Sequence, residues 1–306
     1  MTNVVLVPQR EVTARSAARR AAILSALGFV AVLGPAPPAS AGGISAEIAD
    51  RVLTVTGTAQ DDTITVRCEG GNVTVNQARP SGGPDTCREL RRIAVLAGGG
   101  ADVVNLGDVT RKAFADLRRV LVRGEEGDDR VVGSEHPDEL HGGGGNDELR
   151  GGKGADVVEP GAGPGQVVGG KGRDTVSVEG DDRWVVEDER ITRFTPDEEV
   201  TDLASVEKVR AEGGAGNNTI VAAAFSGRAT LVGGGGGDRL VSGDGNDLLE
   251  GGTGRDTLVA GAGNDELRGG PGDDELRGGE GNDQLLGGGG DDTCVGGPGG
   301  DSFLSC

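Results

Sequence analysis

Residues 233–304 read GGGGGDRLV, SGDGNDLLE, GGTGRDTLV, AGAGNDELR, GGPGDDELR, GGEGNDQLL, GGGGDDTCV and GGPGGDSFL. These eight nonapeptides follow one another without a gap and fit G-G-x-G-x-D-x-U-x, where U is a large apolar residue. Glycine adopts positive φ at low steric cost, so the first six positions predict a turn. The last three predict a short strand whose central U side chain points inward. Two nonapeptides then complete one coil, with turns on opposite sides.

The same pattern occurs earlier in the chain. Six further units cover residues 124–177, a solitary unit covers 97–105, and two degenerate units cover 57–65 and 213–221. Gly165 and Asn218 replace the sixth-position Asp in two of these units. The sixth position carries the residues that we identify as candidate metal ligands, namely Asp102, Asp129, Asp138, Asp147, Asp156, Asp174, Asp238, Asp247, Asp256, Asp265, Asp274, Asp283, Asp292 and Asp301.

These units make the chain resemble the haemolysin-type calcium-binding repeat, the RTX nonapeptide family. The resemblance rests on 15 units between Ala97 and Leu304. It implies an all-β fold, a right-handed parallel β-roll (a β-solenoid) with two nonapeptides per coil. It also implies that Ca²⁺ lies between successive turns on the same side. Its ligands there would be the Asp carboxylates and backbone carbonyls of the two turns.

The residue types in the turns suit calcium on chemical grounds as well. Calcium takes six to eight hard oxygen ligands, which one Asp per turn and the turn carbonyls can supply. Magnesium prefers a strict octahedron with retained waters, and transition metals prefer His or Cys. Because a thin roll buries few side chains, we expect folding of the repeats to be coupled to calcium binding.

The composition excludes several classes of protein. Sixty of the 306 residues are Gly, six are aromatic, and the formal net charge is −20. Nucleic-acid binding needs a basic surface or stacked aromatic side chains, so we expect no nucleic-acid partner. A disordered acidic tract or a metal-free solenoid is the alternative to a calcium-bound roll. The constant register of Asp argues against disorder, which needs no register.

The first 41 residues have the pattern of a secretory signal peptide. A start containing four Arg precedes an uncharged apolar run over 21–33, and Ala39-Ser40-Ala41 fits a cleavage site before Gly42. We therefore expect a secreted, extracellular protein. The apolar run is too short to span a bilayer, and no other stretch is long enough, so we expect no transmembrane segment.

We divide the chain into five segments on this basis. They are a signal peptide (1–41), an N-terminal β cap (42–96), a first β-roll (97–177, degenerate over 106–123), an insertion with degenerate coils (178–232), and a second β-roll (233–306). The stretch 201–209 could also form a short helix.

All four cysteines follow the signal segment, and an even number in a secreted chain predicts disulfides. Three pairings are possible. We favour Cys68–Cys87 and Cys294–Cys306, because each pair is local and the second would clasp the C-terminal end.

The sequence carries no catalytic motif that the repeat does not explain, so we expect a non-enzymatic protein. His136 and His141 lie in EHPDELH, which is not the H-E-x-x-H of zinc proteases, and we expect turn or surface roles for both. The expected function is calcium binding by a secreted, monomeric protein whose protein or polysaccharide partner is unknown. The alternatives are a cell-surface or matrix adhesin that uses the roll as a stalk, and an enzyme with its site in 178–232 or in the cap.

Overall fold

The computed structural model describes residues 43–82, 86–180, 183–187, 190–194 and 199–306. The regular structure in these ranges consists of β-strands, which confirms the predicted fold class. No helix in them is long and apolar enough to cross a membrane. The predicted signal peptide lies outside the described residues and stays a prediction.

The described strands form two 14-stranded sheets. Sheet 1 contains β1 (Ser45–Ala49), β2 (Val52–Thr56), β5 (Ser81–Gly82), β6 (Arg92–Gly99), β8 (Arg119–Glu126), β10 (Asp138–Gly144), β12 (Val157–Ala162), β14 (Thr175–Glu179), β18 (Lys208–Glu212), β20 (Arg228–Gly235), β22 (Leu248–Thr253), β24 (Glu266–Pro271), β26 (Gln284–Gly289) and β28 (Ser302–Leu304). Sheet 2 contains β3 (Thr63–Glu69), β4 (Asn72–Val75), β7 (Val103–Asn105), β9 (Arg130–Val132), β11 (Asp147–Gly154), β13 (Gly165–Gly172), β15 (Arg183–Glu187), β16 (Arg190–Phe194), β17 (Glu199–Ala204), β19 (Thr219–Ala224), β21 (Arg239–Val241), β23 (Thr257–Val259), β25 (Glu275–Arg277) and β27 (Thr293–Val295).

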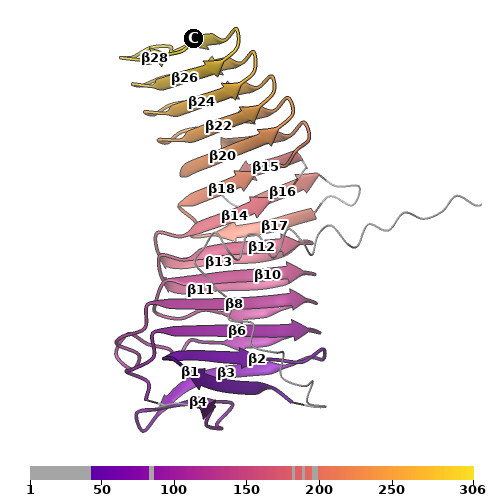
Figure 1. Ribbon diagram of the computed structural model, residues 1–306, viewed down its shortest axis with the longest axis vertical. Helices are drawn as coiled ribbons and strands as arrows, with labels where there is room; N and C mark the ends of the chain where they lie inside the picture. The colour runs from indigo at the N-terminus through magenta and orange to yellow at the C-terminus, as the bar shows by residue number, and fades with distance from the viewer. Residues whose placement is uncertain (1–42, 83–85, 181–182, 188–189, 195–198) are drawn as a thin grey trace, which may run out of the picture. The chain divides into compact units, whose positions relative to one another are not determined.

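Successive nonapeptides place their strands in alternate sheets, so two of them complete a coil (Figure 1). Leu249 of β22 pairs with Leu267 of β24 in sheet 1, and Leu258 of β23 pairs with Leu276 of β25 in sheet 2. Both pairs join equivalent positions of consecutive coils in parallel register. The repeat therefore builds the parallel β-roll that the nonapeptide pattern predicts.

The core between the sheets is a file of eighth-position side chains. Leu240, Leu249, Leu258, Leu267 and Leu276 are all 0% exposed. Each buried leucine contributes roughly 1.5–3 kcal/mol relative to an exposed one. The strands are short, and in each of them the two residues that flank the U residue face outward. Each coil thus buries little beyond these two apolar side chains.

The first coils carry a small antiparallel addition at each sheet edge. In sheet 1, β1 pairs antiparallel with β2 and is flanked by β5. In sheet 2, β4 pairs antiparallel with β3. The Cys68–Cys87 disulfide joins β3 to the segment that follows β5. The N-terminal edges of both sheets are therefore covered by hairpins.

The region that departs from the repeat remains within sheet 2. Strands β15, β16 and β17 form an antiparallel set between β13 and β19, while β14 and β18 pair directly in sheet 1. The possible helix over 201–209 is wrong, because β17 extends to Ala204 and β18 begins at Lys208. Strands from 45 to 304 share the two sheets, and the segment boundaries within them stay predictions.

Both expected disulfides are present. Cys68 bonds Cys87, and Cys294 bonds Cys306. Cys294 occupies the U position of β27 and is half-buried, so the second bond ties the end of the chain to the core file. Phe303, the U residue of β28, is 52% exposed because no described coil covers it.

Candidate metal-binding turns

The glycines of each turn allow neighbouring coils to approach closely. A Cβ on Gly142, the first position of its unit, would lie 2.2 Å from the Asp147 Oδ2 and 2.3 Å from the Pro160 carbonyl oxygen. Gly143 and Gly145, the second and fourth positions, have φ of 118° and 128°. The first glycine is therefore required for space, and the other two for conformation.

One oxygen of each sixth-position carboxylate links two coils. The Oδ1 of Asp147 accepts a hydrogen bond of 2.9 Å from the backbone N–H of Asp129, 18 residues earlier. The same bond recurs along both turn edges and produces four ladders. They run Asp62–Asp102–Asp129–Asp147, Asp138–Asp156–Asp174, Asn218–Asp238–Asp256–Asp274–Asp292, and Asp247–Asp265–Asp283–Asp301.

The other carboxylate oxygen, Oδ2, is buried without a hydrogen bond in most of these turns. It has no partner among the described residues in Asp102, Asp129, Asp147, Asp156, Asp174, Asp256, Asp265, Asp274 and Asp283. A buried anionic oxygen without a donor costs several kcal/mol at least, by the general penalty for desolvated charge. The turn places carbonyl oxygens beside it, as Gly142 shows, and a cation would make this arrangement favourable.

Asn218 supplies a hydrogen-bond donor that is absent when Asp occupies the sixth position of the repeat. Its side-chain Nδ2 donates to the carbonyl of Gly216 at 2.8 Å and to that of Gly233 in the next coil at 3.4 Å. In the Asp turns no such N–H donor is present. A Cβ on Gly142 would lie close to both the Asp147 Oδ2 and the Pro160 carbonyl oxygen, so two oxygens face the same space. Oxygen atoms of this kind are the ligands that a hard metal ion prefers.

Burial raises the pKa of these carboxyl groups. Desolvation is the largest cause, the Oδ1 hydrogen bond opposes it, and neighbouring carboxylates raise the pKa further. The pKa of Asp129 rises to about 7, and those of Asp147, Asp156, Asp256 and Asp265 rise to about 6. A file of partly neutral carboxyl groups would become fully ionised with cations beside it.

The structure places all fourteen candidate Asp residues at equivalent points of their turns. Twelve are buried, whereas Asp292 and Asp301 are half-buried in the last coils. The described residues contain no group of three or more His, Cys, Asp or Glu side chains that could hold a metal ion. A turn site would therefore depend on backbone carbonyls for most of its ligands.

Asp138 differs from the other candidates because Ser134 satisfies both of its oxygens. The Ser134 N–H donates to Oδ2 at 2.5 Å, and the Ser134 hydroxyl donates to Oδ1 at 2.7 Å. The pKa of Asp138 nevertheless rises to about 8, because burial outweighs these hydrogen bonds.

Sequence reasoning missed a second ladder at the fifth position, on the exposed side of the turns. The Oδ1 atoms of Asn246, Asn264 and Asn282 each accept from the backbone N–H of the fifth residue in the next coil, at 2.8 Å. The recurrence of Asn or Asp directly before the sixth-position Asp is the signal that could have revealed this ladder. These bonds fix the spacing of the turns on the solvent side.

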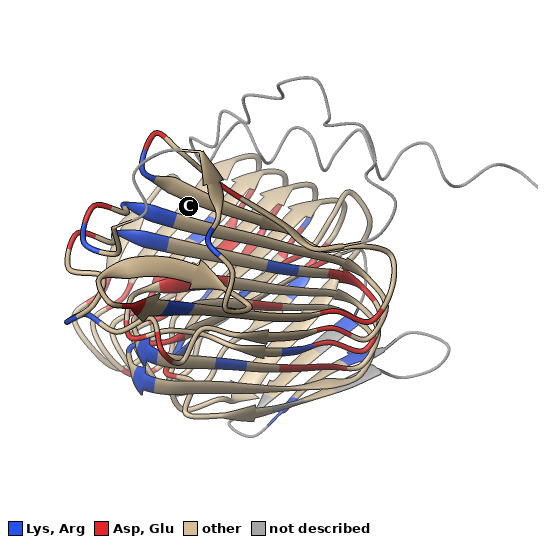
Figure 2. Cartoon of the chain, turned by 90° about the horizontal axis from the view of Figure 1, so that it is seen from below, with Lys and Arg blue, Asp and Glu red and all other residues tan. Residues whose placement is uncertain are grey.

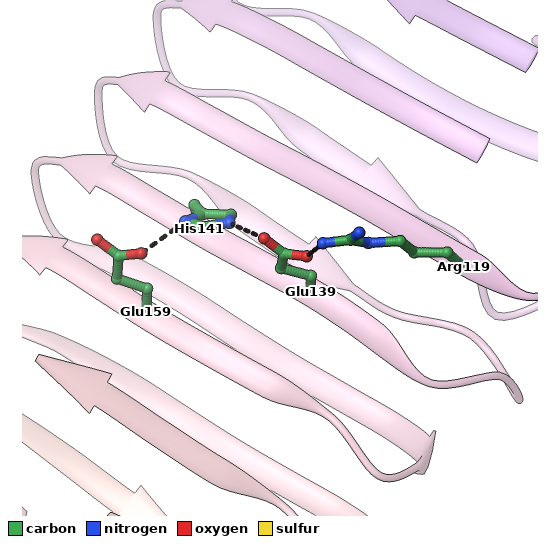
Figure 3. A network of polar contacts seen from close by, with 4 residues as sticks. All are labelled: Arg119, Glu139, His141 and Glu159. Carbon is green, nitrogen blue, oxygen red and sulfur yellow. Dashed lines mark hydrogen bonds and ion pairs between the residues drawn. The ribbon is translucent and has the colours of Figure 1, made fainter. Parts of the chain in front are cut away.

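The two histidines have separate surroundings. His136 lies in a turn, as expected, but is 5% exposed. His141 lies on β10, not in a turn, where its Nδ1 is 2.7 Å from Glu159 and its Nε2 is 3.2 Å from Glu139 (Figure 3). Burial lowers the pKa of His141, but these two carboxylates outweigh it and raise that pKa to about 9. The row is therefore an ion-pair network, which Arg119 extends by contacting Glu139.

Figure 2 shows where Lys, Arg, Asp and Glu lie along the chain, and several of these residues on the strands form ion pairs outside the ladders. Arg268 contacts Glu266 on its own strand and Glu250 on the preceding coil, the latter at 2.8 Å. Arg277 pairs with Glu275 in the same way within β25. Exposed pairs of this kind contribute about 0–1 kcal/mol each.

Two sheets of stacked coils, with a buried carboxylate in most of the repeat turns, define a parallel β-roll. The sequence model of the RTX calcium-binding nonapeptide repeat (4 copies) matches residues 123–158, 210–226, 232–267 and 268–303. The chain therefore carries RTX calcium-binding repeats, and the resemblance noted from its sequence is confirmed.

Comparisons with whole proteins add little to this assignment. No curated protein matches the chain. Among solved structures it is similar to the extracellular lipase LipA from Serratia marcescens, at 19% identity and a TM-score of 0.26. The match covers 66% of this chain and 38% of that lipase, so the chain corresponds to well under half of the lipase's length.

Proposed function

We propose that this protein is a secreted, non-enzymatic calcium-binding β-roll that folds on binding extracellular calcium. The observation that carries the proposal is the buried Oδ2 that lacks a hydrogen bond in turn after turn. In the turns that begin at Gly142, Gly151 and Gly251, a Cβ on that first glycine would meet this oxygen and a carbonyl oxygen of the next coil. Oxygen-only donors of this kind favour calcium over transition metals.

The residues that would hold the ions are the sixth-position Asp side chains together with turn carbonyls. In the turn of Asp256, a Cβ on Gly251 would lie 2.5 Å from Oδ2 and 2.7 Å from the Gly269 carbonyl oxygen of the next coil. A bound calcium ion supplies two positive charges and joins two coils. The Asp ladders orient the carboxylates for this purpose, because Oδ1 is held by the neighbouring backbone and only Oδ2 faces the carbonyls.

Charge and packing both support coupling of folding to the ion. The chain has a formal net charge of −20, and its ladders stack carboxylates in single files. Self-repulsion opposes the compact state, and the core holds about two large side chains per coil. Calcium at 100 times its Kd stabilises a folded site by about 2.7 kcal/mol. Several sites together would therefore determine whether the roll forms.

Secretion and the lack of catalysis are supported by different features. The two disulfides suit an oxidising compartment, and residues 1–41 have the pattern of a signal peptide. Calcium outside cells suits the weak sites of extracellular modules, with Kd of roughly 10⁻⁴–10⁻³ M. The polar residues that the sequence singles out, such as the sixth-position Asp residues and His141, lie in the turn ladders and in an ion-pair row.

Circular dichroism of the purified protein would test the proposal. The protein would be stripped of metal with a chelator and titrated with Ca²⁺, and with Mg²⁺ as the control. We expect strand signal to appear with Ca²⁺ and not with Mg²⁺. A protein that is already fully strand-rich in chelator, and unchanged by Ca²⁺, would refute calcium-coupled folding.

A further inference from the structure

Three turns of the roll are closed by hydrogen bonds from the chain itself. In the unit at 133–141, Ser134 replaces the second glycine and donates to both oxygens of Asp138, at 2.5 and 2.7 Å. Its hydroxyl also accepts from the His136 N–H at 2.9 Å. Both Asp138 oxygens therefore accept hydrogen bonds within the turn, whereas the Asp147 Oδ2 in the next unit has no hydrogen-bond partner among the described residues.

The degenerate unit at 57–65 repeats this arrangement. Thr58 stands at the second position, and both its N–H and its hydroxyl donate to the Asp62 Oδ2, at 2.6 and 2.9 Å. The hydroxyl also accepts from the Gln60 N–H at 3.2 Å. A hydroxyl residue in place of the second glycine thus donates to the Oδ2 of the sixth-position Asp in both turns, and Ser134 also donates to Oδ1.

The third closed turn uses the opposite exchange. Asn218 replaces the sixth-position Asp, and its Nδ2 donates to the carbonyls of Gly216 and Gly233. An N–H donor between these two carbonyls occupies the place where an Asp turn needs a cation. The amide orientation is set by these carbonyls, because the reverse orientation would set oxygen against oxygen.

The three closed turns share one position in the fold. Three of the four ladders begin at these turns: Asp62, Asp138 and Asn218 are first members, and the next members are Asp102, Asp156 and Asp238. The fourth ladder begins at Asp247, whose Oδ1 accepts from the Ala229 N–H.

We propose that these three turns are metal-free starter turns, closed by Ser134, Thr58 and Asn218, and that calcium binds at the other Asp turns of the roll. This inference rests on the proposed function, since it divides the turns of the roll into those that take calcium and those that do not. It removes Asp138 from the candidate calcium ligands. It also makes Asn218 the residue that prevents calcium from binding in its own turn.

Counting bound calcium by native mass spectrometry would test the inference on the purified protein at saturating calcium. The variants are Asp138→Asn, its matched control Asp147→Asn in the adjacent unit, and Asn218→Asp. We expect Asp138→Asn to keep the wild-type number of ions and Asp147→Asn to lose at least one. Asn218→Asp restores the repeat pattern, and we expect it to gain one.

The outcomes separate this inference from the proposed function. A loss of ions in Asp138→Asn as large as that in Asp147→Asn, or no gain in Asn218→Asp, would overturn the starter turns while leaving calcium binding intact. A wild-type protein without bound calcium would refute the proposed function and this inference with it. Circular dichroism of each variant at saturating calcium checks that the roll has formed, and the gain expected for Asn218→Asp does not depend on a loss of stability.

Discussion

A methyl group at the first position of a turn should disrupt the roll, although that glycine does not have a positive φ. A Cβ on Gly269 would lie 2.4 Å from the Asp274 Oδ2 and 2.5 Å from the Gly287 carbonyl oxygen of the next coil. Both distances are about 1 Å shorter than an ordinary contact. One obstacle is backbone, so a side-chain rotation cannot relieve the clash.

Gly269→Ala should therefore cost about 1–3 kcal/mol, the usual penalty for forcing extra atoms into a packed site. For a chain of this size 1 kcal/mol corresponds to roughly 2–4 °C in Tm, so we expect Tm to fall by about 2–12 °C. The new methyl also displaces Asp274 Oδ2, so the calcium concentration needed for half-maximal strand signal should rise.

Gly289→Ala is the matched control. Gly289 is also a turn glycine, but a Cβ there would meet nothing within 4 Å. Alanine in place of an unstrained glycine leaves stability unchanged or raises it by about 0.4–1 kcal/mol. Thermal melts followed by circular dichroism in saturating calcium would compare the two variants. Equal shifts in Tm would show that the space around the first glycine is not what the fold requires.

Three further predictions concern the core, the carboxylates and the disulfide clasp. Leu267→Ala empties one position of the buried file and should cost about 2–5 kcal/mol in urea unfolding with calcium present; a loss below 1 kcal/mol would mean that the coils collapse around the gap. Without calcium, the raised pKa values, about 7 for Asp129 and about 6 for Asp256, mean that the folded state binds more protons than the unfolded chain. That contribution to stability is complete below pH 4 and is lost as pH rises through about 6 to 7. Circular dichroism of the metal-free protein should therefore show more strand structure at pH 5 than at pH 8. The opposite trend would refute the burial of these carboxyl groups. Replacing Cys294 and Cys306 by Ser should cost about 3 kcal/mol, the entropy of a loop of this length, and hydrogen exchange should increase in the last coil first; uniform exchange throughout the roll would contradict a local clasp.

The repeat made most of the roll predictable from sequence, because each nonapeptide meets the same surroundings. Leu249, Leu258 and Leu267 are inward-facing as their eighth position predicts, and the Asp residues share one position in their turns. Prediction was weakest where the repeat breaks. The stretch 201–209 has no glycine pattern, and pairing with neighbouring strands made it β where its local sequence also allowed a helix.

The closed turns could not be found by matching units to a pattern. Ser134 and Thr58 read as imperfect second-position glycines, and Asn218 as an imperfect Asp. Their roles depend on which atoms they meet, such as the carboxylate of Asp138 or the carbonyl of Gly233. Sequence alone gives no distances between coils. A substitution that only departs from the repeat pattern therefore looks the same as one whose side chain takes the place of a bound ion.

The ladders tolerate coils of very different length. Neighbouring rungs are 18 residues apart for Asp129 and Asp147, 27 for Asp102 and Asp129, and 40 for Asp62 and Asp102. The extra residues form loops and, in the longest of these coils, strands β4 and β5, while the strands of the coils keep their pairing. Duplication or deletion of one whole coil would join the same donors to the same acceptors. The number of coils in such a chain can therefore change between lineages without any compensating substitution elsewhere.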